Sequence, residues 1–239
     1  MKKIFLILMV MFLLNGMKVC ATTSYFTNSN GVNLSESEYN FVSDVFWEGF
    51  QEIMTIEDYN KIFDDDLIGK EIVKKTYTKY IPNNTRGTTV TTPQVQLTIT
   101  KVCNTNCLIT TTARWLALAN IRSYDVIGAY LQNTSLVSTV TTRAVTTSAS
   151  QSSNSIKNTS NGFGVSIKSP SGSNLTINQY YSVSLGGHVY ASYQHAIRNI
   201  TLTNSQQYTI SRSGYGGVFL FNSPYNSYYD NMSGVDITV

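Results

Sequence analysis

The chain has 239 residues, of which 42% are hydrophobic and 13% are charged, a composition typical of a globular protein of one or two domains. The formal net charge of +3 lies in the first 21 residues: Lys2, Lys3 and Lys18 are there, and the rest holds 14 basic and 14 acidic residues. That balance argues against a nucleic-acid or anionic-membrane partner, since both require an excess of lysine and arginine.

Residues 1–21 predict a cleavable signal peptide. A basic start is followed by eleven apolar residues at 4–14, and Val19 and Ala21 fit cleavage after Ala21. A membrane-spanning helix needs about 20 apolar residues, so an uncleaved anchor is the weaker interpretation, as is a lipoprotein acylated at Cys20. We therefore expect a secreted, extracellular protein with no integral membrane segment after cleavage.

Residues 22–71 predict an acidic helical segment. They hold two basic and eleven acidic residues, a net charge of −9. Ser35 with Glu38, and Thr55 with Asp58, have the spacing of a capping box, which indicates two helix starts. Apolar residues recur at three- and four-residue steps after the first start, as on one face of a helix.

This segment, residues 22–71, which we call the head, is too small to hold a hydrophobic core of its own. We expect Phe46, Trp47 and Phe50 to pack against the rest of the chain, with the acidic residues of the head near its lysines and arginines. Docking could be permanent, or the head could be a pro-segment that is removed by proteolysis near Lys74 and Lys75. The sequence leaves both alternatives open.

Residues 72–239 predict a basic β-rich domain, with 12 basic and three acidic residues and a net charge of +9. Turn residues interrupt β-branched and aromatic runs about every 8 to 12 residues, which is typical of an antiparallel β-sandwich or barrel-like fold. The expected strands lie near 72–81, 94–103, 107–118, 123–131, 135–146, 163–168, 175–185, 188–195, 198–203, 207–212, 217–222 and 234–239. The Ser/Thr/Asn-rich stretch 146–161 has Ile156 as its single large apolar residue, so we expect a mobile loop there.

Cys103 and Cys107 predict a disulfide within a β-hairpin. When they are placed opposite each other, alternation sorts Val95, Leu97 and Ile99 onto one face and Gln96, Thr98, Thr100, Thr110, Thr112 and Arg114 onto the other. Directly opposite residues lie within disulfide range, and cysteines of an exported chain are expected to be oxidised. A redox pair or a metal site is the alternative, but redox motifs usually space their cysteines by two and no histidine is near.

Catalytic and cofactor motifs are weak. His188 and His195 are seven residues apart and would face opposite sides of one strand, so a shared metal is not expected. No Gly-x-Ser-x-Gly motif occurs, and the β-rich domain holds only Asp125, Asp230 and Asp236 as acids. We expect no enzyme and no cofactor, with a hydrolase as the least favoured alternative.

Tyrosine is the functional signal: nine of the 16 tyrosines lie between Tyr180 and Tyr229. Tyrosine gives rigid contact area with a polar tip, which suits glycan or protein binding, although it also fits half-buried strands. The residues expected to bind an unknown protein or carbohydrate ligand are Tyr190, Tyr193, Tyr215, Tyr225, Tyr228 and Tyr229.

The segment Ser192-Tyr193-Gln194-His195, followed by Gly216-Gly217-Val218-Phe219, resembles the secreted bacteriocins of the lactococcin 972 type. The resemblance covers less than a fifth of the chain, Val218 replaces the tryptophan of that pattern, and its second histidine is missing. The favoured hypothesis is therefore a secreted, non-enzymatic bacterial β-protein that binds a surface, glycan or protein through its tyrosine-rich strands. A bacteriocin or toxin-like effector is the alternative.

Overall fold

The fold is known from a computed structural model that describes residues 24–85, 88–117, 121–153, 156–200, 208–212, 218–230 and 234–239, with residues 81–93 described by their backbone alone. The structure is mainly β, with 49% strand and 13% helix, which confirms the expectation of a mainly β protein. The expected signal peptide lies outside the described residues. In the described part of the chain, no helix is long and apolar enough to cross a membrane.

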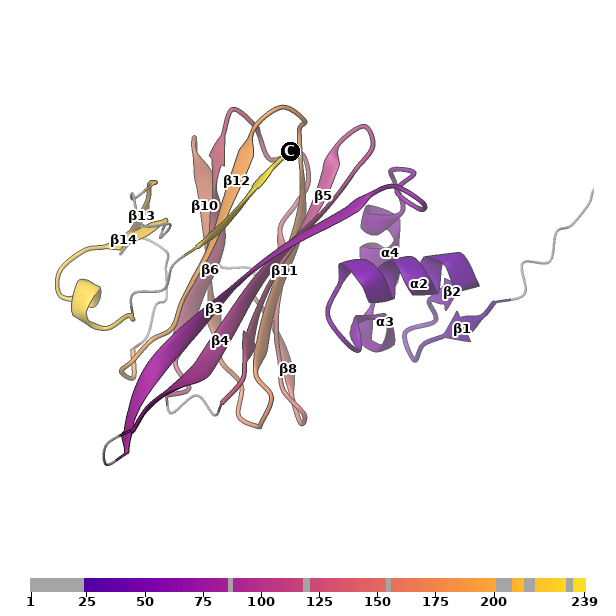
Figure 1. The fold of residues 1–239 in the computed structure, drawn as a ribbon. Helices are drawn as coiled ribbons and strands as arrows, with labels where there is room; N and C mark the ends of the chain where they lie inside the picture. The colour runs from indigo at the N-terminus through magenta and orange to yellow at the C-terminus, as the bar shows by residue number, and fades with distance from the viewer. Residues whose placement is uncertain are drawn as a thin grey trace, which may run out of the picture.

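Antiparallel strands form two main sheets (Figure 1). The six-stranded sheet has the order β3-β4-β5-β11-β7-β8. Its strands are β3 (Ile72–Thr85), β4 (Thr88–Cys103), β5 (Cys107–Trp115), β11 (Thr176–Val183), β7 (Thr141–Val145) and β8 (Ser150–Ser153). The five-stranded sheet has the order β15-β12-β6-β10-β9. Its strands are β15 (Val235–Thr238), β12 (His188–Gln194), β6 (Tyr124–Gln132), β10 (Gly162–Lys168) and β9 (Ile156–Thr159).

The core lies between these two sheets. Leu97, Ile109 and Ala113 of the six-stranded sheet, with Ile127 and Val189 of the five-stranded sheet, are fully buried in it. The opposite face of each sheet carries a further layer, because the helices lie beside the six-stranded sheet and a small hairpin lies beside the five-stranded one (Figure 1). That hairpin is formed by β13 (Tyr208–Ile210) and β14 (Phe219–Phe221), followed by the 3-10 helix η2 (Tyr225–Ser227).

The acidic head forms helices where the capping boxes predict them. Ser35 caps α2 (Glu36–Val45) and Thr55 caps α4 (Ile56–Ile62), each with the reciprocal bonds of a capping box. A single turn, α3 (Phe50–Ile53), connects them, and a two-residue pair, β1 (Phe26–Thr27) with β2 (Asn33–Leu34), precedes them. Gly49 has a φ of 80°, a left-handed conformation that lets the chain turn sharply into α3.

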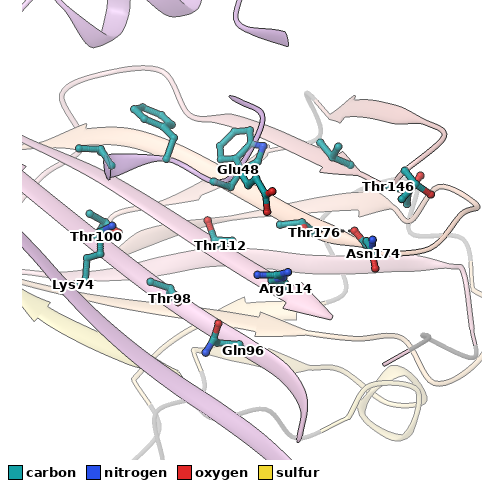
Figure 2. A pocket seen from close by; sticks show the side chains of 15 residues that line it. Glu48, Lys74, Gln96, Thr98, Thr100, Thr112, Arg114, Thr146, Asn174 and Thr176 are labelled. Atoms are coloured by element: carbon teal, nitrogen blue, oxygen red, sulfur yellow. Dashed lines mark hydrogen bonds between the residues drawn. The ribbon is translucent and has the colours of Figure 1, made fainter. Parts of the chain in front are cut away.

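The β4–β5 hairpin has the register that the sequence predicts. Cys103 faces Cys107, and the pairing continues to Val95 opposite Trp115. The apolar side chains point into the core, whereas Gln96, Thr98, Thr100, Thr112 and Arg114 lie on the outer face (Figure 2).

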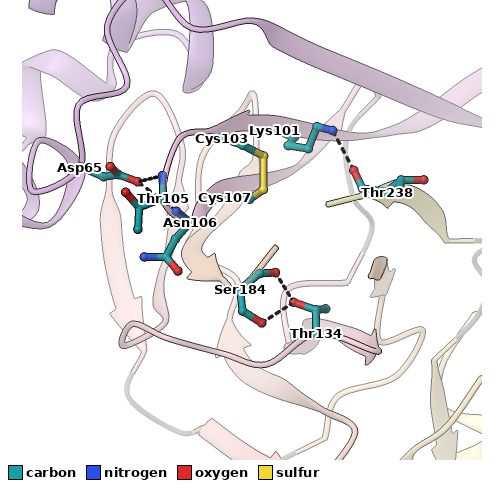
Figure 3. Close-up of a disulfide and its surroundings, with 9 residues drawn as sticks. All are labelled: Asp65, Lys101, Cys103, Thr105, Asn106, Cys107, Thr134, Ser184 and Thr238. Atoms are coloured by element: carbon teal, nitrogen blue, oxygen red, sulfur yellow. Dashed lines mark hydrogen bonds between the residues drawn. A yellow bond between two sulfur atoms is a disulfide. The ribbon is translucent and has the colours of Figure 1, made fainter. Parts of the chain in front are cut away.

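The expected disulfide is present between Cys103 and Cys107, whose Cα atoms lie 4.0 Å apart (Figure 3). The head caps the loop that this disulfide closes. The Asp65 carboxylate accepts hydrogen bonds from the backbone amides of Thr105 (3.0 Å) and Asn106 (3.1 Å) and from the Asn104 side chain (2.8 Å). We expected lysines or arginines near this carboxylate, but its hydrogen-bond donors are neutral groups.

The head packs against the outer face of the six-stranded sheet, as its apolar stripe predicts. Phe46, Trp47 and Phe50 are buried in one cluster with Val102, Leu108 and Tyr180 of the sheet. A buried ion pair joins the two parts: Arg143 Nη2 lies 2.5 Å from Asp58 Oδ2, and the Tyr180 hydroxyl donates to the same carboxylate. Whether the head is ever removed stays a prediction, but Lys74 and Lys75 lie within β3 rather than in a loop.

Two expectations for the β-rich region differ from the structure. β3 and β4 continue beyond 81 and before 94 into a long hairpin, with a register shift between Lys79 and Tyr80 where Tyr80 pairs with Pro93. The stretch 146–161 contains β8 and β9, which pair with β7 and β10 at the edges of the two sheets. The mobility of that stretch stays a prediction.

Candidate functional site

The structure divides the six tyrosines that were expected to bind a ligand. Tyr193 is fully buried between the sheets and Tyr229 is buried under the β13–β14 hairpin, so neither ring offers a contact surface in this structure. Tyr190, Tyr225 and Tyr228 are partly exposed on the outer side of the five-stranded sheet. Tyr215 lies outside the described residues. Arg198 lies over the ring of Tyr228 and Arg212 over the ring of Tyr190. We call these three partly exposed tyrosines and the two arginines the outer tyrosine surface.

Tyr190 forms the first arginine–tyrosine pair of this surface. It lies on β12 opposite Tyr130 of β6, and the Arg212 guanidinium sits 4.6 Å from its ring centroid. The Tyr190 hydroxyl (3.0 Å) and Arg212 Nη1 (3.3 Å) both donate to Oε1 of Gln132. His188, two residues earlier on the same strand, lies roughly parallel to the Tyr190 ring at 6.0 Å. Ring, guanidinium and amide therefore hold one another in place.

A second arginine–tyrosine pair packs against the same buried cluster as Tyr190. The Arg198 guanidinium lies 5.3 Å from the centroid of Tyr228, whose ring meets Tyr225 edge-on at 5.7 Å. The layer below is closely packed: Phe221 and Tyr229 stack with centroids 3.9 Å apart. Partly exposed rings on a rigid base are pre-organised for contact, because little side-chain entropy remains to be lost.

Close packing beneath the surface depends on Gly164 of β10. A Cβ atom at this position would lie 2.6 Å from the Tyr208 hydroxyl oxygen and 2.8 Å from the Phe219 ring. The absence of a side chain lets both rings lie directly on the strand. The β13–β14 hairpin can therefore sit flat against the five-stranded sheet.

Asp125 anchors the segment that carries these residues. This buried carboxylate accepts bonds from Ser169 Oγ (2.7 Å), the Tyr193 hydroxyl (2.6 Å) and the Ala196 amide (2.9 Å), and lies 2.8 Å from His195 Nδ1. Burial, together with the adjacent Asp125 charge, raises the pKa of Tyr193 well above its usual value, so its hydroxyl stays protonated and donates. The network fixes the point at which the chain leaves β12.

The His195–Asp125 contact bears on the hydrolase alternative, because a His–Asp pair is part of a catalytic triad. In a triad the serine hydroxyl bonds to the histidine ring, whereas Ser169 bonds to the carboxylate on its other oxygen. His195 is also only 4% exposed. Within the described residues, no group of three or more His, Cys, Asp or Glu side chains could hold a metal ion. This network is therefore explained as a structural anchor.

Charge on the outer tyrosine surface is uneven. Two acids border this surface, and both pair with lysines: Asp230 lies 2.6 Å from Lys79, and Asp236, which faces Tyr190 across the strands, lies 3.9 Å from Lys75. Arg198 and Arg212 are exposed, and neither forms a salt bridge with another residue in the described part of the chain. The surface therefore presents uncompensated guanidinium groups beside aromatic rings.

Sequence patterns did not indicate the two arginines as site residues. The sequence offered one indication: Arg198 and Arg212 are the only lysine or arginine residues after Lys168, and they lie among the clustered tyrosines. In comparisons with known proteins, neither a family model nor a curated protein matches this chain.

Proposed function

We propose that the chain is a secreted, non-enzymatic binding protein whose outer tyrosine surface recognises an anionic carbohydrate of a cell surface. The observation that carries the proposal is the pair of exposed guanidinium groups stacked on Tyr190 and Tyr228. A guanidinium that lies over a ring and forms no salt bridge keeps donors free for a ligand, and its planar geometry suits bidentate binding of carboxylate, sulfate or phosphate. The rings add area on which a sugar can stack.

Binding to immobilised dextran sulfate and polygalacturonate, with neutral dextran as the reference, tests the proposal on residues 22–239. The Arg198→Ala/Arg212→Ala variant should bind both polyanions at least about 10-fold more weakly, because a hydrogen bond to a charged group contributes about 1.5–3 kcal/mol. Added salt should weaken binding by the unmodified protein.

The matched control is Lys70→Ala/Lys74→Ala, which removes the same charge from exposed positions on the head and on β3 of the other sheet. An equal loss in both double variants would indicate binding by net charge alone, and no binding to either polyanion would disprove the proposal. The alternative function, a bacteriocin or toxin-like effector, predicts growth inhibition of related bacteria by the purified protein.

A further inference from the structure

A groove lies between the head and the outer face of the six-stranded sheet, away from the outer tyrosine surface. Residues 45–48 form its upper side, and the polar face of the β4–β5 hairpin forms its floor (Figure 2). Its volume of about 510 Å³ is within the range of about 300–1,000 Å³ typical of small-molecule sites.

The upper side of the groove is held firmly. The Thr110 hydroxyl donates to the Val45 carbonyl at 2.9 Å, which ties the end of α2 to β5. Phe46 and Phe50 stack with centroids 4.4 Å apart and meet the ring of Tyr180 edge-on. These contacts within the protein fix the upper side of the groove, as is usual for ligand sites that are largely pre-formed.

One buried polar group that lines the groove has no partner among the described residues. Trp47 is 8% exposed, and its indole N–H makes no hydrogen bond. Buried polar groups are nearly always satisfied, so a ligand in the groove that accepts a hydrogen bond would satisfy this N–H.

The chemistry of the lining selects the class of that occupant. The floor carries the hydroxyls of Thr98, Thr112 and Thr176, and each hydroxyl can both donate and accept. Glu48 reaches toward this floor from above, and Arg114 and Lys74 line it (Figure 2). None of the three forms a salt bridge with another described residue. An anion would meet Glu48 and a cation would meet Arg114, whereas a neutral polyhydroxyl ligand can use both.

We propose that this groove binds a short neutral oligosaccharide. Sugar hydroxyls match a lining that mixes donors and acceptors, and the Trp47 N–H donates to one of them. The site is independent of the outer tyrosine surface, because its residues come from the head and from the other sheet.

A panel of neutral saccharides (cellobiose, chitobiose, lactose, maltotriose and mannobiose) tests this on the full mature chain by calorimetric titration. At least one member should bind, and Trp47→Phe, which removes the N–H but keeps an aromatic ring, should weaken its affinity at least about 5-fold. Thr112→Val should do the same, because it replaces a hydroxyl by a methyl group of similar shape.

The matched control is Thr209→Val, an exposed threonine on β13 that does not line the groove, which should bind as the unmodified protein does. Arg198→Ala/Arg212→Ala should bind the neutral saccharide with unchanged affinity. This variant therefore distinguishes the groove from the polyanion site proposed above. Circular dichroism and melting curves must show that each variant is folded. Absence of binding by the whole panel, or affinity unchanged in both folded groove variants, would overturn the proposal.

Discussion

Asp58→Asn is the most informative test of how the head is attached. The Asp58 carboxylate accepts from Arg143, from Tyr180 and from the amide and hydroxyl of Thr55, so one group caps α4 and joins it to the sheet. The side chains of Arg143 and Asp58 are only 11% and 4% exposed. Loss of the negative charge leaves a buried guanidinium without its counter-ion.

The expected cost follows from that burial. Removal of one partner of a buried ion pair typically costs about 3–5 kcal/mol. For a chain of this size, 1 kcal/mol lowers Tm by roughly 2–4 °C, so the variant should melt roughly 6–20 °C below the unmodified protein. The measurement is thermal and urea unfolding at pH 7, followed by circular dichroism.

Glu57→Gln is the matched control, because the neighbouring acid on the same helix pairs with Lys61 at 2.8 Å but is 77% exposed. Exposed pairs contribute about 0–1 kcal/mol, so this variant should unfold almost as the unmodified protein does. The double variant Asp58→Asn/Arg143→Gln should regain part of the lost stability, since it contains no uncompensated charge. Equal and small shifts in Asp58→Asn and Glu57→Gln would refute the view that this pair attaches the head.

Three further outcomes are expected. Replacement of both cysteines, Cys103→Ser/Cys107→Ser, should lower the free energy of unfolding by no more than about 2 kcal/mol in urea titrations, because the closed loop is short, and a lost binding activity would contradict a purely structural role. Burial opposes ionisation of Glu38, Asp58 and Asp65, but hydrogen bonds to each carboxylate outweigh it and hold each pKa below its usual value. These groups therefore stabilise the fold above the unfolded-state pKa of about 4, and that stability is lost as pH falls through the lower folded-state values; urea midpoints should drop below pH 4, and less steeply in Asp58→Asn. Intact mass of the protein from culture medium should correspond to a start at Thr22 with two hydrogens fewer than the reduced chain, whereas cell-bound protein that retains Met1 would contradict export.

The sequence predicted those elements whose signals are local. Capping boxes at Ser35 and Thr55 mark helix starts because the side chain and the amide that it bonds are three residues apart. The β4–β5 register was predictable because a slip of one residue would place the alternating apolar side chains on the wrong face.

The length of the β3–β4 hairpin was not predictable from local signals. Pro82 and Pro93 argue against strand, yet β3 is an edge strand and Pro93 lies at the register shift, where proline is tolerated. The 146–161 stretch has no apolar alternation, and its short strands pair only at sheet edges.

The site was predicted in part, because composition indicates tyrosine but not its exposure. Tyr193 and Tyr190 are three residues apart on β12 and therefore face opposite sides of the sheet, one into the core and one outward. The groove was missed because it is formed by segments far apart in sequence. Only the fold brings Trp47 over the polar face of the β4–β5 hairpin.

The hydrogen bonds and the ion pair between the head and the sheet join segments that are made at different times. Asp58 and Tyr180 are 122 residues apart, and Asp58 and Arg143 are 85 apart. During synthesis the head emerges before β4, β5 and β11, which supply Val102, Leu108 and Tyr180 of the cluster that buries its aromatic residues. Contacts this distant in sequence close large loops and form slowly. We therefore expect the aromatic residues of the nascent head to stay exposed until β11 has been made.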